Sequence, residues 1–354
     1  MNVLVTGGGG FLGSHIARAL RERGDDVTVF GRRRYPALER GGIRGIQADV
    51  RDAGAVFDAC RGTDAVFHVA ARVGIWGPRL DYWKTNVNGT RNVIEGCRAA
   101  RVGRLIFTST PSAVFSTEEL CGADESQPYA PRHLTAYSET KAEAERMVLG
   151  ATDDALRTIA IRPHLVWGPH DPNLIPRIAA RAGQGRLVQV GKGDNLVDIT
   201  YIDNAVHAHL LACDALGRSE IGAGRAYFVS DGRPVRLWPW LNQLLAALGV
   251  PGVRRRVSFR AAYAAGAVLE AAYRVVGRAD EPPMTRFLAC QLARSHYFSI
   301  EGAGRDLGYA PIVSTDEGLR RLAAWWPDRA SDKSEPGAPT PPRLSADSTR
   351  AEIC

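Results

Sequence analysis

The chain has 354 residues, of which 45% are hydrophobic and 23% charged, with a formal net charge of +7. This composition predicts a soluble, cytoplasmic globular protein with a sizeable core. The six cysteines form no C-x-x-C pair and no Cys/His cluster with zinc spacing, so we predict no metal site and isolated thiols in a reducing compartment. The chain starts with a strand, so no signal peptide is expected, and the longest apolar stretch, 261–276, is too short to span a bilayer. The arginines are scattered, which argues against nucleic acid as a partner and weakly favours anionic small molecules or surfaces.

The first secondary-structure unit is a strand, a glycine turn and a helix. Residues 1–5 form an apolar, β-branched run, and T-G-G-G-G-F-L-G follows at 6–13 with glycines at 7, 10 and 13. Residues 14–20 have helical periodicity, which Gly24 ends. Such glycines let the backbone turn tightly and approach a pyrophosphate, whose charge the helix N-terminus stabilises. The unit therefore predicts a dinucleotide cofactor.

The next segments alternate between strand and helix. Strands are predicted at 27–30, 45–48, 65–69, 105–108 and 158–161, and this alternation indicates an α/β fold with a Rossmann-type, doubly wound parallel sheet. We assign residues 1–165 to a dinucleotide-binding domain. After Pro163 the pattern loosens into Pro- and Gly-rich loops, helices at 173–183, 203–216 and 237–248, and a strand at 226–229. Residues 166–326 are therefore expected to form a smaller, partly interleaved substrate lobe with segments returning to the main sheet. The Pro-rich, polar residues 327–354 are expected to be a disordered tail.

The candidate acid–base residues are Tyr137 and Lys141, which form a Y-x-x-x-K pattern. Residues four apart on a helix lie on the same face. A lysine ammonium beside a phenol stabilises the phenolate and lowers the tyrosine pKa. Two hydroxyl residues, Thr110 and Ser112, follow the strand at 105–108, where ligands of open α/β sheets bind. Either could hydrogen-bond a substrate oxygen, and either could equally serve ordinary turn chemistry.

The order of motifs resembles a known family. The matching segments are T-G-G-G-G-F-L-G, Asp49-Val50, H-V-A-A at 68–71, N-V-N-G-T at 86–90, T-S-T-P-S at 108–112, Y-S-E-T-K at 137–141, I-R-P-H-L-V-W-G-P at 161–169 and Y-I-D-N-A at 201–205. Together they are similar to the extended short-chain dehydrogenases/reductases of the 3β-hydroxysteroid dehydrogenase group, over about residues 1–325. Within the group, S-T-P-S, W-G-P and N-L-V-D-I-T-Y-I-D-N are more similar to the 2-alkyl-3-oxoalkanoate reductases of bacterial olefin biosynthesis than to the decarboxylating sterol-4α-carboxylate 3-dehydrogenases.

The resemblance implies a role for each matching residue. Tyr137 would be the catalytic acid–base and Lys141 its partner. Thr110 falls where the family has serine, and Ser112 stays a second candidate for the catalytic hydroxyl. Asn86 is expected to be structural. The cofactor would contact Gly7, Gly10, Phe11, Leu12, Gly13, Arg32, Arg33, Asp49, Val50, Ala70, Ala71, Tyr137, Lys141, Pro163 and His164, and the substrate would contact Ser112, His164 and Trp167.

The residues after the second strand predict the cofactor. NAD enzymes usually have an acid there that accepts from the ribose 2′-hydroxyl. This chain has Phe30 and Gly31, followed by arginines at 32–34. Guanidinium groups suit a 2′-phosphate, so we predict NADP(H) rather than NAD(H), with a solvated basic loop as the alternative interpretation.

The predicted substrate is an apolar β-keto or β-hydroxy acid. His164, Arg162 and Arg177 are candidates for holding its carboxylate, each with a structural ion pair as the alternative. The apolar segment 260–277 could wall the pocket, form a homodimer surface, or contact a membrane surface or pathway enzyme. We favour NADPH-dependent reduction of a 2-alkyl-3-oxo acid. The alternatives are an oxidative 3β-hydroxysteroid or sterol-carboxylate dehydrogenase, a sugar-nucleotide epimerase, and a non-catalytic NADP-binding regulator.

Overall fold

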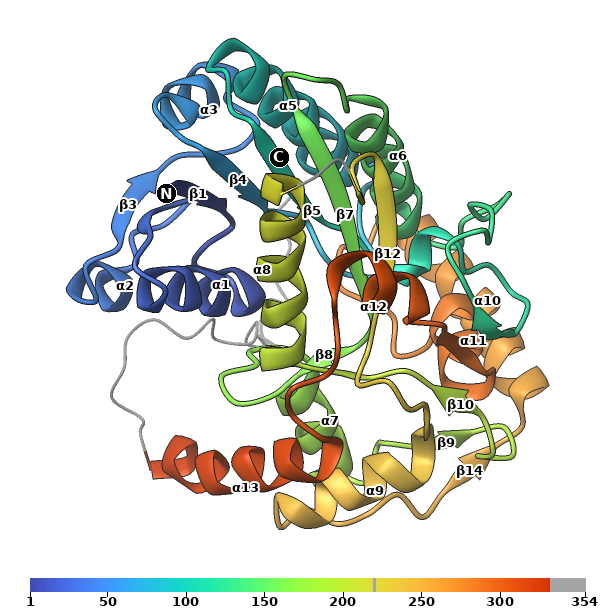
Figure 1. The fold of residues 1–354 in the computed structure, drawn as a ribbon. Coiled ribbons are helices and arrows are strands. Elements are labelled where there is room, and N and C mark those ends of the chain that lie inside the picture. Colours follow the sequence, from blue (N-terminus) through green and yellow to red (C-terminus); the bar gives the residue numbers. More distant parts are fainter. Residues whose placement is uncertain (219–220, 332–354) are drawn as a thin grey trace, which may run out of the picture.

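The computed structural model describes residues 1–218 and 221–331, with side chains up to residue 326. Its centre is a seven-stranded sheet in the order β12-β7-β5-β4-β1-β2-β3, and every pair is parallel (Figure 1). The strand order runs outward in both directions from β1, which confirms the predicted doubly wound sheet. The strands are β1 (Asn2–Thr6), β2 (Asp26–Gly31), β3 (Arg44–Gln47), β4 (Ala65–His68), β5 (Arg104–Thr108), β7 (Arg157–Pro163) and β12 (Arg225–Val229).

Helices cover both faces of this sheet because successive strand residues point to opposite sides. In β1, Val3 and Val5 face α1 (Phe11–Glu22) and α8 (Ile202–Arg218), whereas Leu4 faces the other layer. That second layer comprises α3 (Ala53–Cys60), α5 (Gly89–Ala99) and α6 (Ala136–Gly150). The short α2 (Pro36–Arg40) follows β2, while α4 (Arg79–Tyr82) and a π-helical turn (Trp83–Asn88) precede α5.

A second lobe lies against the carboxyl ends of the central strands (Figure 1). Its four-stranded sheet has the order β13-β10-β15-β6, and two further strand pairs, β11–β8 and β14–β9, lie beside it. The strands are β6 (Leu120–Ala123), β8 (Val166–Trp167), β9 (Gln189–Val190), β10 (Leu196–Val197), β11 (Thr200–Tyr201), β13 (Val235–Arg236), β14 (Arg256–Val257) and β15 (His296–Phe298). The helices are α7 (Leu174–Gly183), α9 (Leu237–Ala247), α10 (Phe259–Val276), α11 (Arg286–Ala293), α12 (Glu301–Leu307) and α13 (Thr315–Ser331).

The two halves of the chain exchange strands. β12 returns to the central sheet and pairs with β7, while β6, from the first half of the chain, pairs with β15 in the small sheet. Residues 327–331, predicted as part of the tail, continue helix α13, and 332–354 lie outside the described residues. Within the described residues, no helix is long and apolar enough to cross a bilayer.

Candidate active site

The glycine turn brings three chain segments into backbone contact. Gly7 has φ +69°, and a Cβ there would lie 2.7 Å from the backbone of Ala70. A Cβ on Gly13 would lie 2.3 Å from the Gly7 carbonyl oxygen. Larger residues would therefore push β1, the segment after β4 and helix α1 apart.

Helix α1 begins at this turn with free donors. Gly10 is its N-cap, and among the described residues no side chain caps it and no acid lies in its first turn. The first N–H groups of a helix have no partner within the helix, so those of Phe11, Leu12 and Gly13 are available to an anion. The charge and the free donors of this helix start suit a dinucleotide pyrophosphate.

A buried hydrogen-bond chain holds the segment after β4 in place. The Thr6 hydroxyl oxygen accepts from the Ala70 N–H (3.3 Å) and pairs with His68 Nδ1 (2.7 Å), while His68 Nε2 pairs with the Thr90 hydroxyl (2.9 Å). Burial, together with the charge of Lys141, lowers the pKa of His68 to about 3. The neutral ring therefore ties β1, β4 and α5 together and holds Ala70, and Ala71 after it, beside the glycine turn.

The three arginines after β2 differ in their contacts. Arg34 forms an ion pair with Glu39 (2.9 Å). The exposed side chains of Arg32 and Arg33 have no ion-pair partner in the part of the chain that the structure describes. Tyr35 lies over the end of β2, since a Cβ on Gly31 would come within 2.4 Å of its hydroxyl oxygen. Arg32 and Arg33 are thus free to meet an anionic group at the end of β2.

Two residues that follow β3, Asp49 and Val50, were predicted to contact the cofactor, and they differ in exposure. Arg51 donates to both carboxylate oxygens of Asp49 (3.0 and 2.7 Å), and this ion pair holds the pKa of Asp49 below its usual range. Val50 is buried under α5, where a Cβ on Gly89 would lie 2.9 Å from it. Only the backbone of Val50 is therefore placed to meet a cofactor.

Helix α6 presents Tyr137 and Lys141 at the carboxyl ends of β4 and β5. Lys141 is buried, donates to the Thr108 carbonyl oxygen and lies 3.8 Å from the centre of the Phe107 ring. Burial lowers the pKa of Lys141 to about 7. Burial also raises the pKa of Tyr137 to about 12, against which a hydrogen bond with Thr110 acts. The phenol is therefore a protonated group at neutral pH, suited to donating a proton, and the sequence-based expectation of a lowered pKa does not describe this state.

Thr110 and Ser112 lie together beside Tyr137. Thr110 caps the 3-10 turn at Pro111–Ala113, accepting from the Ser112 N–H (3.2 Å), and the two hydroxyl oxygens are 3.1 Å apart. Both candidate hydroxyls thus belong to one cluster, and Thr110 is the one that contacts the phenol.

Asn86 connects backbone segments around the site. Its side-chain oxygen accepts from the Arg72 N–H (2.7 Å), and its amide donates to the Arg72 carbonyl oxygen (3.1 Å) and the Thr140 hydroxyl (3.0 Å). These bonds hold the segment after β4 against α6, in agreement with the predicted structural role.

The three side chains predicted to hold a substrate carboxylate each interact with another residue of the protein. His296 Nε2 donates to the Gln291 carbonyl oxygen (3.0 Å), so its Nδ1 accepts from His164 Nε2 (2.7 Å). Burial and His296 hold the pKa of His164 well below its usual range, so His164, next to Pro163 at the end of β7, is neutral. Arg162 forms a buried ion pair with Glu145 (2.6 Å), and Arg177 pairs with Glu281 at the surface (2.6 Å).

Trp167 is not brought to the site. It is fully buried and packs edge-on against Tyr201 and Trp240, with ring centroids 5.2 and 5.5 Å apart. These contacts make it a core residue of the second lobe.

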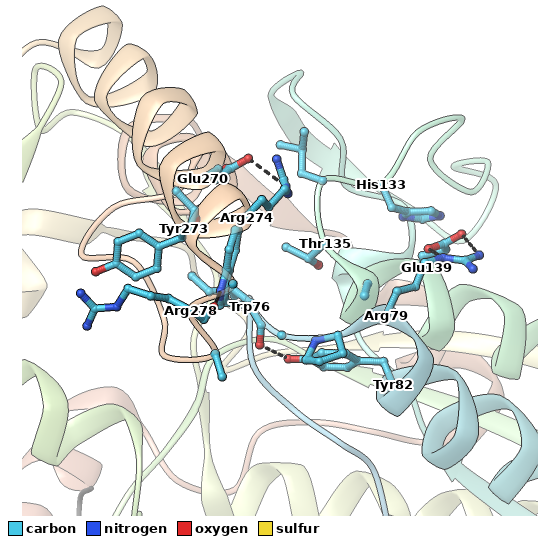
Figure 2. Close-up of a pocket in the computed structure, with 18 residues that line it drawn as sticks. Trp76, Arg79, Tyr82, His133, Thr135, Glu139, Glu270, Tyr273, Arg274 and Arg278 are labelled. Carbon is cyan, nitrogen blue, oxygen red and sulfur yellow. Dashed lines mark hydrogen bonds and ion pairs between the residues drawn. The ribbon is translucent and has the colours of Figure 1, made fainter. Parts of the chain in front are cut away.

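A cavity of about 580 Å³ opens between α10 and the start of α6, the helix that carries Tyr137 (Figure 2). Residues in the ranges 75–82, 133–139 and 270–285 contribute its walls, and Ala136, the neighbour of Tyr137 in the chain, is one of them. Figure 2 shows helix α10 with Glu270 and Arg274 facing Thr135, His133 and Glu139 across this space. Except for the apolar segment 260–277 and Glu139 in the Y-S-E-T-K motif, these wall residues were not noted in the sequence. The W-G-P-R run at 76–79, which includes Trp76, was a sequence pattern from which this part of the wall could have been predicted.

The fold and the site together define a class of protein. A glycine turn at a helix start, together with a half-buried tyrosine and a buried lysine one turn apart on another helix, is typical of an oxidoreductase with a nicotinamide cofactor. A family comparison agrees: residues 4–259 match the 3-beta hydroxysteroid dehydrogenase/isomerase family, and the chain belongs to it.

Three relatives are informative. A 2-alkyl-3-oxoalkanoate reductase of Stenotrophomonas maltophilia (strain K279a) is 50% identical over 92% of this chain and 99% of its own. A decarboxylating sterol-4-alpha-carboxylate 3-dehydrogenase of Mus musculus is 33% identical over 93% and 92%. The solved structure of MoeE5 with UDP-glucuronic acid and NAD has a TM-score of 0.70 at 25% identity, over 94% of this chain and 100% of its own.

Proposed function

We propose that the protein reduces the 3-keto group of a 2-alkyl-3-oxoalkanoic acid with NADPH, forming the 2-alkyl-3-hydroxyalkanoic acid, as a step of olefin biosynthesis. The observation that carries the proposal is the similarity to reductases of that name in two bacteria, at 50% and 47% identity over 92% and 91% of this chain. Further support comes from the site, whose protonated tyrosine suits the reductive direction.

The residues of the site would divide the reaction between them. The carbonyl carbon would receive its hydride from a bound nicotinamide cofactor. Tyr137 donates its phenolic proton to the carbonyl oxygen, and the Thr110 hydroxyl hydrogen-bonds that same oxygen. The charge balances because hydride and proton together convert the ketone to an alcohol. Lys141, one turn along α6, stabilises the phenolate that remains.

The NADPH preference rests on the end of β2. Arg32 and Arg33 are exposed, have no ion-pair partner among the described side chains, and follow a strand without a terminal carboxylate. A 2′-phosphate there would gain two guanidinium contacts, whereas a 2′-hydroxyl would find no acid to accept its proton.

The cavity supports an alkyl substrate. Trp76 and Tyr273 meet edge-on at its wall (ring centroids 6.2 Å apart), and Ile75 and Leu134 add aliphatic surface. We propose that the alkyl chain lies against these side chains while the keto group reaches Tyr137.

The second candidate function is oxidation of a 3β-hydroxysteroid or a sterol-4α-carboxylate, supported by the relatives at 33% and 34% identity. A turnover assay with NADPH and a 2-alkyl-3-oxo acid, beside thermal shift with NADPH, tests both the proposal and the non-catalytic alternative. Consumption of NADPH is expected. A thermal shift without any turnover would contradict the proposed function and favour a regulator.

A further inference from the structure

The outer face of α10 is an exposed apolar stripe. Val268, Val275 and Val276 are 68%, 87% and 72% exposed. The other exposed positions on this face are alanines, at 261, 264, 265, 271 and 272. Together these positions recur every three or four residues, so they form one continuous surface along a helix about 27 Å long.

The inner face of the same helix is already occupied. A Cβ on Gly266 would lie 2.6 Å from the backbone of Thr285, so α10 packs closely against the start of α11. Glu270 is buried and accepts from Arg286 (2.7 Å) and Arg274 (3.4 Å). The helix is therefore fixed with its apolar face outward, at the periphery of the second lobe (Figure 1).

Arginines lie before the stripe and along one of its edges. Arg254, Arg255 and Arg256 precede the helix, are exposed, and have no ion-pair partner within the described chain. On the helix, Arg260 lies four residues before Ala264 and Arg274 three residues after Ala271, so both flank one edge of the stripe.

We propose that α10 docks the enzyme on an anionic lipid surface, with the Ala/Val stripe in the interface and the arginines on the lipid headgroups. Apolar burial and attraction of basic residues to anionic lipid are the two forces that hold an interfacial helix. A second copy of the chain fits less well, because a two-fold contact through this face would bring the same arginines together.

Docking would also serve the site. Tyr273, Arg274 and Gly277 line the cavity at the start of α6, whereas Val275 and Val276, on the same turn, face outward. An alkyl chain leaving the lipid surface would need to pass only this end of α10 to enter the cavity. This consequence rests on the proposed function, but the docking itself does not.

The test is vesicle flotation of the full chain. Wild type should float with phosphatidylcholine vesicles that contain phosphatidylserine, more weakly with phosphatidylcholine alone, and less in high salt. Changing Val268, Val275 and Val276 to Asp should lower binding by at least about tenfold. The matched control is Ile312→Asp, which changes a residue that is 61% exposed and lies outside α10, and it should bind like wild type.

A second set of variants tests the charges. Replacing Arg254, Arg255 and Arg256 with Glu should weaken binding by at least about fivefold per residue, and Arg233→Glu should not. The melting temperature with NADPH and the turnover of a short soluble substrate should be unchanged in the valine variant, which separates docking from catalysis. Absence of wild-type flotation, or flotation equal in the valine variant, overturns the proposal. A dimer that the valine variant converts to a monomer, without vesicle binding, would assign the face to a second copy instead.

Discussion

Replacing Arg32 and Arg33 with alanine should abolish the preference for NADPH over NADH. A charge-assisted hydrogen bond contributes about 1.5–3 kcal/mol, and because both arginines are exposed we expect the lower value, roughly tenfold in Kd per contact. The two contacts share one phosphate and are not additive, so the Kd for NADPH should rise between about 10- and 100-fold. The Kd for NADH should change by less than about threefold, because no 2′-phosphate is present.

The matched control is Arg34→Ala. Arg34 lies in the same run but is paired with Glu39, so its loss should leave the ratio of the two Kd values near that of wild type. Fluorescence titration of both cofactors, repeated at high salt, measures the effect. The reasoning is refuted if wild type binds NADH more tightly, or if Arg34→Ala changes the ratio as much as the double variant does.

The remaining predictions concern the catalytic helix. Tyr137→Phe removes only the hydroxyl, so NADPH affinity should stay within about threefold of wild type while turnover falls by about 10²-fold or more; retained turnover would place the proton donor elsewhere. Lys141→Met should also be inactive. The unfolded chain keeps Lys141 protonated up to about 10.5, whereas the folded chain releases this proton near 7. The contribution of Lys141 to the free energy of unfolding of wild type therefore rises with pH between those two values. The melting-temperature difference, Lys141→Met minus wild type, should be more positive at pH 6 than at pH 9, and a difference independent of pH would contradict the buried-charge explanation.

Local signals explain what the sequence could predict. The strand, glycine turn and helix at 2–22 are contiguous, and their period and glycine spacing are visible in one short window. Tyr137 and Lys141 are likewise four residues apart on one helix. The central sheet follows because its strands are separated by helices in a regular alternation.

Long-range pairings explain what could not be predicted. β6 and β15 pair across about half the chain, and several strands of the second lobe have only two residues, too few to show a period. His164 meets His296 from 132 residues away, which fixes it as a neutral ring rather than a cation. The cavity is likewise assembled from three distant segments, and no local pattern in any of them shows that they meet.

The measurement that tests the central claim most directly is the dependence of kcat/KM on alkyl length. It can be followed by NADP⁺ reduction with 2-alkyl-3-hydroxy acids of increasing length, beside a 3β-hydroxysteroid. A cavity that buries the chain gains about 0.8 kcal/mol per methylene, so kcat/KM should rise by up to about fourfold for each added CH₂ until the cavity is filled. Trp76→Ala should make the increase in kcat/KM per CH₂ smaller, because it removes part of the cavity wall that the alkyl chain contacts. Faster turnover of the steroid, or indifference to alkyl length, would contradict the proposed substrate.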